Sequence, residues 1–540
     1  MYKKLKYYFN RIKEAPLSSI ITILLIRFKK IIFFFYYNRF LHPIFNSFSD
    51  KLEVNDNINL EKNLGLSQNR LSKEPLYHDV INGVFQCLGY GRLKIPNNSE
   101  WLSDNLHNYK WKMKYFNNID YVSTNNFCDV KIPWEMSRLQ YLVILAYSFI
   151  ETKDKKNLDR YCLIINDWIK SNPPGYGVNW TCTMEVSIRM INIAISFMTI
   201  KNHLSKKQIK IINRSLSDHK KYISFFPELS DVPGNHYLSN LMGEFVIESI
   251  SGRQEKTDKK LKKFLKETKN QFLSDGSHFE MSPTYHIMCL EMVAVVIAFA
   301  LRLKTKNDES ITSLKNIYRN GIAFCDKIGN SYEVPIFGDN DSGQIISLDK
   351  KTRNYKSLKQ FLNIIENKPL ESHLDYHNIL LLSITNIDQI NTTIKNRKKT
   401  RALSFKGQCF MGLKVNNLSA VMRYGLQGLK QRASHDHDDA LHVNLSKDGK
   451  DILVDKGCHS YTLDQKIREE YILSSAHNSL KEIGKERFYG AKGSIVKTVR
   501  GALVGNNPSC FDNKLDEAEM TASLKENKYS NFKKNERSVN

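Results

Sequence analysis

The sequence has little cysteine and none of the signatures of several large protein classes. Its nine cysteines stand singly among 540 residues, with no CxxC pair. This scatter argues against a disulfide framework and against a zinc site built from thiolates. No helix-turn-helix, RNP or zinc-finger pattern is present, so we do not expect a nucleic-acid partner. No tetratricopeptide, HEAT or ankyrin consensus is visible either, which argues against those repeat arrays.

Acidic residues are few beside basic ones. The chain has 56 Asp and Glu against 80 Lys and Arg, a formal net charge of +24 at pH 7. Such an excess favours a polyanionic partner, whether polysaccharide, nucleic acid or membrane surface. Lysine is spread along the whole chain, however. A generally basic, solvated surface therefore explains much of the charge equally well.

A long hydrophobic run and a signal-peptide cleavage site are also lacking at the N-terminus. The apolar runs Leu17–Ile26 and Ile31–Tyr37 are too short to span a bilayer, and no small-residue cleavage site follows them. Residues 1–50 carry nine Lys and Arg against two acidic residues. We expect residues 1–60 to form a basic segment that lies on a membrane surface. The alternative is a first helix packed on the main domain, with its basic side in water.

The sequence does have a long stretch of helical patterning. Between about residues 65 and 330, apolar residues recur at three- and four-residue spacing. The predicted helices are Trp134–Ile150, Leu158–Ile169, Met184–Ile200, Lys207–Phe225, Leu238–Ile250, Leu261–Leu273, Tyr285–Leu303 and Ile311–Ile328. Short breaks separate them, which favours antiparallel neighbours and a closed or partly closed α/α barrel. We place this helical domain at residues 61–390.

A second, β-rich domain is predicted from Arg401 onward, where short alternating stretches and glycine turns appear. We place this domain at residues 391–540. Its last stretch, Asn506–Asn540, is polar and poor in strand pattern. We therefore expect a truncated or pared-down domain.

Chemically versatile side chains are concentrated in the stretch Ala433–Tyr461. It opens with five consecutive imidazole and carboxylate side chains at positions 435–439. An alternating strand, an Asp-Gly turn and a return strand then predict a hairpin that brings Asp455 close to His437. His477 offers a third ligand. Two imidazoles and a carboxylate are a common ligand set for Zn²⁺.

Two other interpretations of this cluster stay open. His-x-His-x-Asp is also the start of the metallo-β-lactamase ligand motif, which makes a zinc hydrolase one alternative. That motif usually continues with His directly after Asp439, where this chain has Ala440. An acidic, histidine-bearing surface loop is the other alternative.

The functional clues of the helical region lie in its breaks. Asn235 and His236 follow a Pro-Gly turn and open a helix, where free N–H groups and the helix dipole favour an anion. Asp275–His286 lies at the entry to a later helix, and Pro335–Gly343 is a polar loop. Loops at one end of a barrel jointly form a cleft, so we expect these breaks to share one rim.

Taken together, the motifs resemble the heparinase II/III family of polysaccharide lyases. The residues that carry the resemblance are, in order, Trp134, Glu135, Arg138, Trp180, Glu185, Arg189, Asn235, His236, Asp275–His286, Phe337–Gly343, His435–Asp439, Asp455 and Ala476–Asn478. The match covers about residues 75 to 500. It implies an incomplete N-terminal α/α toroid, a C-terminal antiparallel β-sandwich, and a cleft between them for an acidic polysaccharide. The activity it implies is cleavage of a uronate-containing glycan by β-elimination.

The resemblance also implies catalytic roles. Asn235, with His236, would neutralise the C5 carboxylate of the uronate. Tyr285 and His435 would act as base and acid on the two faces of the sugar. A tyrosine base needs cationic neighbours, because the reference pKa of a phenol is about 10. We consider Arg189 and His236 as those neighbours.

Two further groups of residues are assigned by the resemblance. The expected substrate-binding residues are Trp134, Glu135, Arg138, Trp180, Glu185, Arg189, His278, Glu280 and Asp339. The expected metal ligands are His437, Asp455 and His477. They would hold a structural Zn²⁺ that fixes the loop bearing His435.

Other functions share the same residues. A uronyl C5-epimerase forms the same carbanion but reprotonates C5, and a non-catalytic glycan-binding protein of capsule or lipopolysaccharide metabolism keeps only the cleft. The resemblance favours the cell envelope or periplasm as the location. The basic N-terminus without a clear signal peptide equally fits a cytoplasmic, membrane-associated protein.

Overall fold

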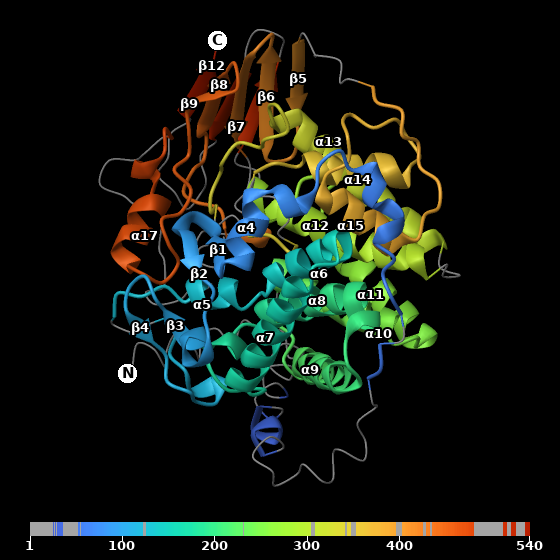
Figure 1. Cartoon of the computed structure of the whole chain (residues 1–540). Helices are drawn as coiled ribbons and strands as arrows, with labels where there is room; N and C mark the ends of the chain where they lie inside the picture. Colours follow the sequence, from blue (N-terminus) through green and yellow to red (C-terminus); the bar gives the residue numbers. More distant parts are fainter. Residues whose placement is uncertain are drawn as a thin grey trace.

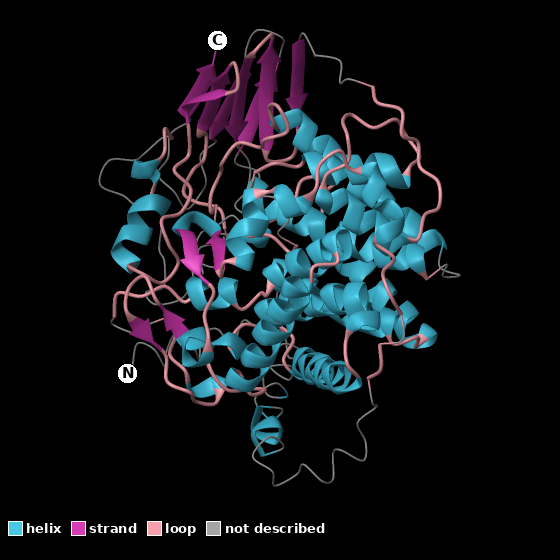
Figure 2. Ribbon diagram, viewed as in Figure 1, coloured by secondary structure: helices cyan, strands magenta, loops and turns pink. Residues whose placement is uncertain are grey.

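The computed structural model describes residues 52–479 apart from short gaps, residues 25, 28 and 30–35, and strands within residues 511–539. Most helices come first along the chain, and the two larger sheets gather at its C-terminal end (Figures 1 and 2). Two short strand pairs, β1 (Val84–Cys87) with β2 (Gly91–Lys94) and β3 (Ser103–Asp104) with β4 (Tyr109–Lys110), precede most of the helices. The helices that build the main body are α4 (Pro75–Ile81), α5 (Lys131–Met136), α6 (Gln140–Thr152), α7 (Lys155–Ser171), α8 (Thr183–Ile200), α9 (Lys206–Phe225), α10 (Asn235–Ile250), α11 (Gln254–Gln271), α12 (Pro283–Arg302), α13 (Asp308–Ile328), α14 (Lys356–Ile365) and α15 (Tyr376–Thr385). This order confirms the predicted fold class, a helical region followed by an antiparallel sheet.

The helices form two layers. The inner helices α6, α8, α10, α12 and α15 neighbour one another in that order and are buried on nearly every side. The outer helices α7, α9, α11 and α13 each pack on the inner helix before them and bury only one face. Inner and outer helices alternate along the chain because each hairpin carries one apolar and one amphipathic helix.

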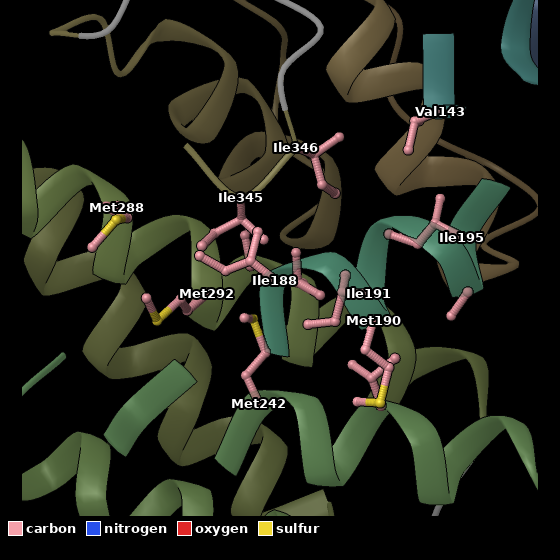
Figure 3. Packing of buried hydrophobic residues seen from close by; sticks show 14 of the residues in the cluster. Val143, Ile188, Met190, Ile191, Ile195, Met242, Met288, Met292, Ile345 and Ile346 are labelled. Atoms are coloured by element: carbon pink, nitrogen blue, oxygen red, sulfur yellow. The ribbon is translucent and has the colours of Figure 1, made fainter. Parts of the chain in front are cut away.

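The centre of the helical layer is filled by aliphatic and thioether side chains (Figure 3). Ile188 and Ile191 of α8 lie beside Met242 of α10 and Met292 of α12, and Ile345 from a later loop belongs to the same cluster. Both α8 with its following turn (Thr183–His203) and α12 are long and apolar enough to span a membrane, but 100% and 94% of their apolar windows are buried inside the protein. Their hydrophobicity is thus explained by their place in the core.

One predicted helix is divided in the structure. The pattern of Trp134–Ile150 predicted a single helix, but α5 ends at Met136 and α6 begins at Gln140. Leu139 between them has a φ of 57°, which is left-handed and cannot continue a right-handed helix. The side chain of Arg138 in this break is paired with Glu185. That contact with α8 is tertiary, so helical periodicity did not reveal the break.

The main sheet has five antiparallel strands in the order β5-β6-β7-β8-β9. The strands are β5 (Ala402–Lys406), β6 (Phe410–Val415), β7 (Leu418–Arg423), β8 (Val443–Lys447) and β9 (Lys450–Leu453). The predicted hairpin is confirmed, since Lys447 pairs with Lys450 across the turn. Asp448 and Gly449 in that turn have φ angles of 54° and 76°, as a two-residue hairpin turn requires.

A second sheet lies in the C-terminal stretch whose sequence is polar and poor in strand pattern. It has the order β10-β11-β12 and lies against β5 and β6 of the main sheet. Its strands are β10 (Phe511–Leu515), β11 (Met520–Leu524) and β12 (Asn535–Val539). Backbone pairing thus forms three strands within Asn506–Asn540 without the alternating apolar pattern that the sequence analysis relied on. Whether the domain is pared down stays a prediction.

The main sheet is joined to the helical region through a shared core. The ring of Phe410 on β6 lies 5.8 Å from that of Phe324 on α13 and 5.2 Å from that of Phe337. The long connection from β7 to β8 and the segment between β9 and α17 (Gln465–Ile472) reach back from the sheet to the helices. They carry His435, His437, Asp455 and Tyr461.

The described part of the N-terminal segment packs on the helical region with one side only. Phe33 is 1% exposed, and its ring contacts those of Tyr222 and Phe226 at 5.6 and 4.8 Å. Phe28 and Ile31 are 60% and 56% exposed. Packing on the main domain is thus present, and membrane contact stays a prediction for the exposed apolar side.

Candidate active site

The candidate site is assembled from two helix N-termini and one long loop. Asn235 is the first residue of α10. Tyr285 lies in the first turn of α12, where Ser282 caps the helix by accepting from the Tyr285 N–H. His435 lies in the connection from β7 to β8. Its backbone carbonyl accepts from the N–H of Asp339 at 2.7 Å, which fixes this loop on the helical region.

Glu280 holds Asn235 in place. The backbone N–H of Asn235 donates to Oε1 of Glu280 at 2.9 Å, and its side-chain Nδ2 donates to Oε2 at 2.5 Å. The same Nδ2 lies 3.2 Å from Nε2 of His435. Burial raises the pKa of Glu280, but His435, His278 and these two hydrogen bonds outweigh it and hold the pKa below its usual value. Glu280 therefore remains a carboxylate that orients the amide.

Tyr285 and His435 are stacked. Their ring centroids are 3.5 Å apart and the ring planes differ by 16°. The hydroxyl of Tyr285 lies 2.7 Å from that of Tyr461. The Tyr461 ring in turn lies 4.4 Å from the guanidinium of Arg468 and 5.6 Å from Nζ of Lys131. Two cations thus flank the phenol pair, and neither had been predicted.

Asp339 links the two histidines of the loop to an arginine. His435 Nδ1 lies 3.1 Å from Oδ2 of Asp339, and His437 Nε2 lies 3.0 Å from Oδ1. Arg468 donates to both oxygens, at 3.1 and 2.9 Å. Burial raises the pKa of Asp339, but Arg468 and the two histidines hold it well below its usual value. Asp339 is 0% exposed and orients the two imidazoles by hydrogen bonds. We had expected it to contact substrate.

The predicted metal ligands do converge. The donor atoms of His437, Asp455 and His477 all lie within 4.8 Å of one another. Asp455 accepts from the backbone N–H groups of Gly338 and Gly457 at 2.9 and 2.8 Å, which aims its carboxylate. Burial and the nearby Asp439 raise the pKa of Asp455 well above its usual value.

A cation would offset that penalty on Asp455. Asp339 contacts Nε2 of His437, so a metal would be bound through Nδ1. A carboxylate on the far nitrogen is the usual support of a metal-binding histidine. The residues therefore fit a zinc ion.

Six of the expected substrate-binding residues lie inside the helical layer. Arg138 donates to both oxygens of Glu185 at 2.7 and 2.8 Å, and Glu135 lies 2.8 Å from the same guanidinium. Arg189 donates to Nε2 of His219 at 2.9 Å. Trp134 and Trp180 are 5% and 1% exposed. These contacts tie α5 and the break after it to α8, and α8 to α9.

The cations near Tyr285 differ from those that the sequence analysis expected, Arg189 and His236. Arg189 lies against the ring of Trp168 at 4.4 Å, and His236 lies 3.2 Å from Glu228. The cations beside the Tyr285–Tyr461 pair are instead Arg468 and Lys131. His278 is buried under Glu280, and burial lowers the pKa of its imidazole to about 4.

Sequence reasoning had missed Tyr461 and Arg468. Tyr461 ends the stretch that was singled out, and Arg468 lies on α17 just beyond it. A lone tyrosine and a lone arginine carry no spacing signal. Only the fold of the segment after β9 brings them to Tyr285 and Asp339.

Comparison with known proteins covers both regions of the chain. Residues 97–365 match the family model described as heparinase II/III N-terminus, and residues 398–519 match the model described as heparinase II/III-like, C-terminal. A heparin-sulfate lyase of Pedobacter heparinus is 21% identical over 220 residues, which are 39% of this chain and 33% of that protein. The matched part thus spans about a third of the length of that relative. A crystal structure of heparinase III superposes with a TM-score of 0.58 at 16% identity, covering 93% of this chain and 72% of that one.

Proposed function

Because this chain belongs to the heparinase II/III family of polysaccharide lyases, we propose that it cleaves an acidic, uronate-containing glycan by β-elimination. The observation that carries the proposal is the convergence of an amide, a phenol and an imidazole. Asn235 lies 3.2 Å from His435, and His435 is stacked on Tyr285 at 3.5 Å. Elimination at a uronate needs these three kinds of group together.

The first requirement is stabilisation of the substrate carboxylate. Removing the proton at C5 spreads negative charge onto the neighbouring carboxylate, so hydrogen-bond donors placed there lower the barrier. Asn235 is the donor at the N-terminus of α10. Glu280 orients its side-chain amide by accepting from Nδ2 and holds its backbone by accepting from the N–H. With substrate bound, the N–H of Nδ2 that faces His435 would turn to the carboxylate, while the N–H bonded to Glu280 keeps the amide oriented.

The second requirement is a base. Asp339 is a carboxylate that accepts the Nδ1–H of His435, so the lone pair of this imidazole is at Nε2. The distance from Asn235 Nδ2 to that nitrogen, 3.2 Å, agrees with this tautomer. His435 can therefore take a proton at Nε2, on the side of the site where Asn235 would hold the carboxylate.

Tyr285 supplies the acid, and the base for the opposite C5 configuration. Its hydroxyl shares a hydrogen bond with that of Tyr461. As the acid Tyr285 must be a neutral phenol; in the base role it would be a phenolate, which the positive charge of Arg468 and Lys131 near the Tyr461 ring would favour. In the elimination the base takes the C5 proton, the C4–O4 bond breaks and a C4–C5 double bond forms. The departing O4 receives a proton from the tyrosine.

The metal group supports this site from outside the reaction. His437, Asp455 and His477 would hold a zinc ion, whose contribution is to fix the loop between β7 and β8. His437 touches the same Asp339 that orients His435. A zinc ion bound there would therefore help to hold the base, His435, in place through the carboxylate of Asp339.

The test is ultraviolet absorbance of the unsaturated uronate product with heparan sulfate, hyaluronan and alginate as substrates. Wild type should produce the band with at least one glycan, and Tyr285→Phe should lose about 10²–10⁴-fold in rate. Tyr318→Phe is the matched control, because this buried tyrosine donates to Leu358 on the outer side of the toroid. If the band were absent with every glycan, the proposed lyase activity would be overturned. Deuterium exchange at C5 without a band would identify an epimerase.

A further inference from the structure

A second group of potential metal ligands lies at the rim of the helical layer. Cys182 is the residue just before α8, Glu228 lies in the loop between α9 and α10, and His236 is in the first turn of α10. Their donor atoms all lie within 4.8 Å of one another. Cys182 is 3% exposed, and the side chains of Glu228 and His236 are each 29% exposed. Two of the three side chains are thus partly accessible to solvent, and the cysteine is buried.

The geometry excludes a cysteine-based catalytic triad. In such a triad the imidazole contacts the nucleophile with one nitrogen and the acid with the other. Here Nδ1 of His236 faces both partners, at 3.8 Å from Sγ of Cys182 and 3.2 Å from Oε1 of Glu228. Sγ of Cys182 is itself 3.7 Å from that same oxygen. The three donor atoms therefore face a common point.

The ligand types select the kind of ion. A thiolate, an imidazole and a carboxylate suit Zn²⁺ and related transition metals, whereas Ca²⁺ and Mg²⁺ prefer oxygen ligands only. Glu228 is prepared for this role, because its other oxygen, Oε2, accepts from the N–H of Met184 at 2.7 Å. Its backbone N–H donates to Oδ1 of Asn240 at 2.8 Å. These contacts leave Oε1 pointing at Cys182 and His236.

Without a metal, hydrogen bonds hold the three side chains together, and Cys182 and His236 keep their protons. Burial and the charge of Glu228 raise the pKa of the Cys182 thiol to about 11. Burial lowers the pKa of His236, but Glu228 and Cys182 outweigh it and raise the pKa well above its usual value. A metal would replace the thiol proton and the imidazole Nδ1 proton, so binding should tighten as pH rises.

We propose that Cys182, Glu228 and His236 form a second metal site, for a divalent ion of the zinc class with three protein ligands and one open position. It differs from the His437 group in ligand type and in the elements that build it. The proposal does not depend on the lyase activity. Its place does matter for that activity, since His236 directly follows Asn235 and a bound ion would add positive charge beside the amide.

The test is titration of the metal-free full chain with Co²⁺, followed by absorbance and by metal analysis. Thiolate-to-cobalt charge transfer absorbs in the near ultraviolet, and the His437 group contains no thiolate. Wild type should show this band, Cys182→Ser should lose it, and His437→Ala should keep it. Cys162→Ser is the control for incidental binding, because Cys162 is a partly exposed cysteine on α7.

Glu228→Gln provides a second variant in case Cys182→Ser does not fold. It keeps the shape of the side chain and the contact with Met184 but weakens a ligand, so the Co²⁺ dissociation constant should rise at least tenfold with the band retained at saturation. Absence of the band in wild type would overturn the proposal. Persistence of the band in a folded Cys182→Ser variant, or unchanged affinity in Glu228→Gln, would do the same.

Discussion

At the residue scale, the contacts of Tyr461 separate a positioning role from a packing role. Its hydroxyl is 2.7 Å from that of Tyr285, and its ring carries Arg468 on one face at 4.4 Å. The two hydroxyls share one hydrogen bond, so the ease with which Tyr285 gives up or takes a proton depends on its neighbour. Tyr461 thereby links the cation Arg468 to the hydroxyl of Tyr285.

We expect Tyr461→Phe to lower kcat on an accepted glycan by about tenfold or more, with little change in KM, because it removes one hydrogen bond to the reacting phenol. The pH profile of kcat should also shift, since the partner that shares the proton is lost. Tyr332→Phe, distant from the site and bonded to Glu371, is the control. An unchanged kcat and pH profile would assign Tyr461 to packing alone.

At the scale of elements, the break between α5 and α6 is held by a buried ion pair. Arg138 and Glu185 are both 0% exposed and make two parallel hydrogen bonds at 2.7 and 2.8 Å. Burial raises the pKa of Glu185, but Arg138 outweighs it and holds the pKa below its usual value. The pair connects the break to α8, so its removal should be felt as lost stability.

Replacing Arg138 by methionine should therefore lower the free energy of unfolding by about 3–5 kcal/mol, because Glu185 would be left charged and unpaired in the core. Urea denaturation followed by circular dichroism measures this change. Arg138→Met with Glu185→Gln should recover part of the loss, since the charge is gone. If Arg138→Met were fully stable and only raised KM, the arginine would be a substrate ligand, as the family resemblance first implied.

The N-terminal segment is a second element, and it has an exposed apolar side. Phe28 and Ile31 are more than half exposed, although Phe33 nearby is buried. Basic residues outnumber acidic ones by nine to two over residues 1–50. We propose that this exposed apolar side contacts an anionic membrane surface, with the basic residues adding electrostatic attraction.

Sedimentation with vesicles of anionic lipid tests that contact. Phe28→Glu combined with Ile31→Glu should weaken binding at least tenfold, because both substitutions remove apolar area and add repulsive charge. Phe127→Glu is the matched control, since Phe127 is 56% exposed elsewhere on the protein. Equal sedimentation of all three proteins would remove the segment from any membrane role.

At the scale of the whole molecule, the His437 group joins parts of the chain that are far apart in sequence. His437 comes from the β7–β8 connection, Asp455 follows β9, and His477 follows α17. Gly338, from the helical region, donates to Asp455 at 2.9 Å. A metal bound here would therefore stabilise the junction between the sheet and the helices as well as the loop bearing His435.

Chelation should accordingly lower the thermal midpoint and reduce turnover without abolishing it. An ion at a hundredfold excess over its Kd contributes about 2.7 kcal/mol to stability. Differential scanning calorimetry with and without EDTA, with zinc added back as the control, measures the effect. Equal zinc contents of wild type and His437→Ala would refute the site. Complete and zinc-dependent loss of turnover would point to a zinc hydrolase instead.

Local patterns in the sequence were enough to predict most helices, the Asp-Gly hairpin and the meeting of His437 with Asp455. Each of these depends on residues close together in the chain, where periodicity and turn chemistry act directly. The resemblance to a family added Asn235, Tyr285 and His435, and the structure brings these three together.

Tertiary structure alone decided the rest. Contacts between distant segments decide three features. These are the break before Gln140, the hydrogen bonds of Asp339 with two histidines, and the pairing of Tyr285 with Tyr461. The Cys182 group has no spacing signal for the same reason. Which way a side chain faces depends on how helices and loops pack, and packing is set by the whole core rather than by neighbours in sequence.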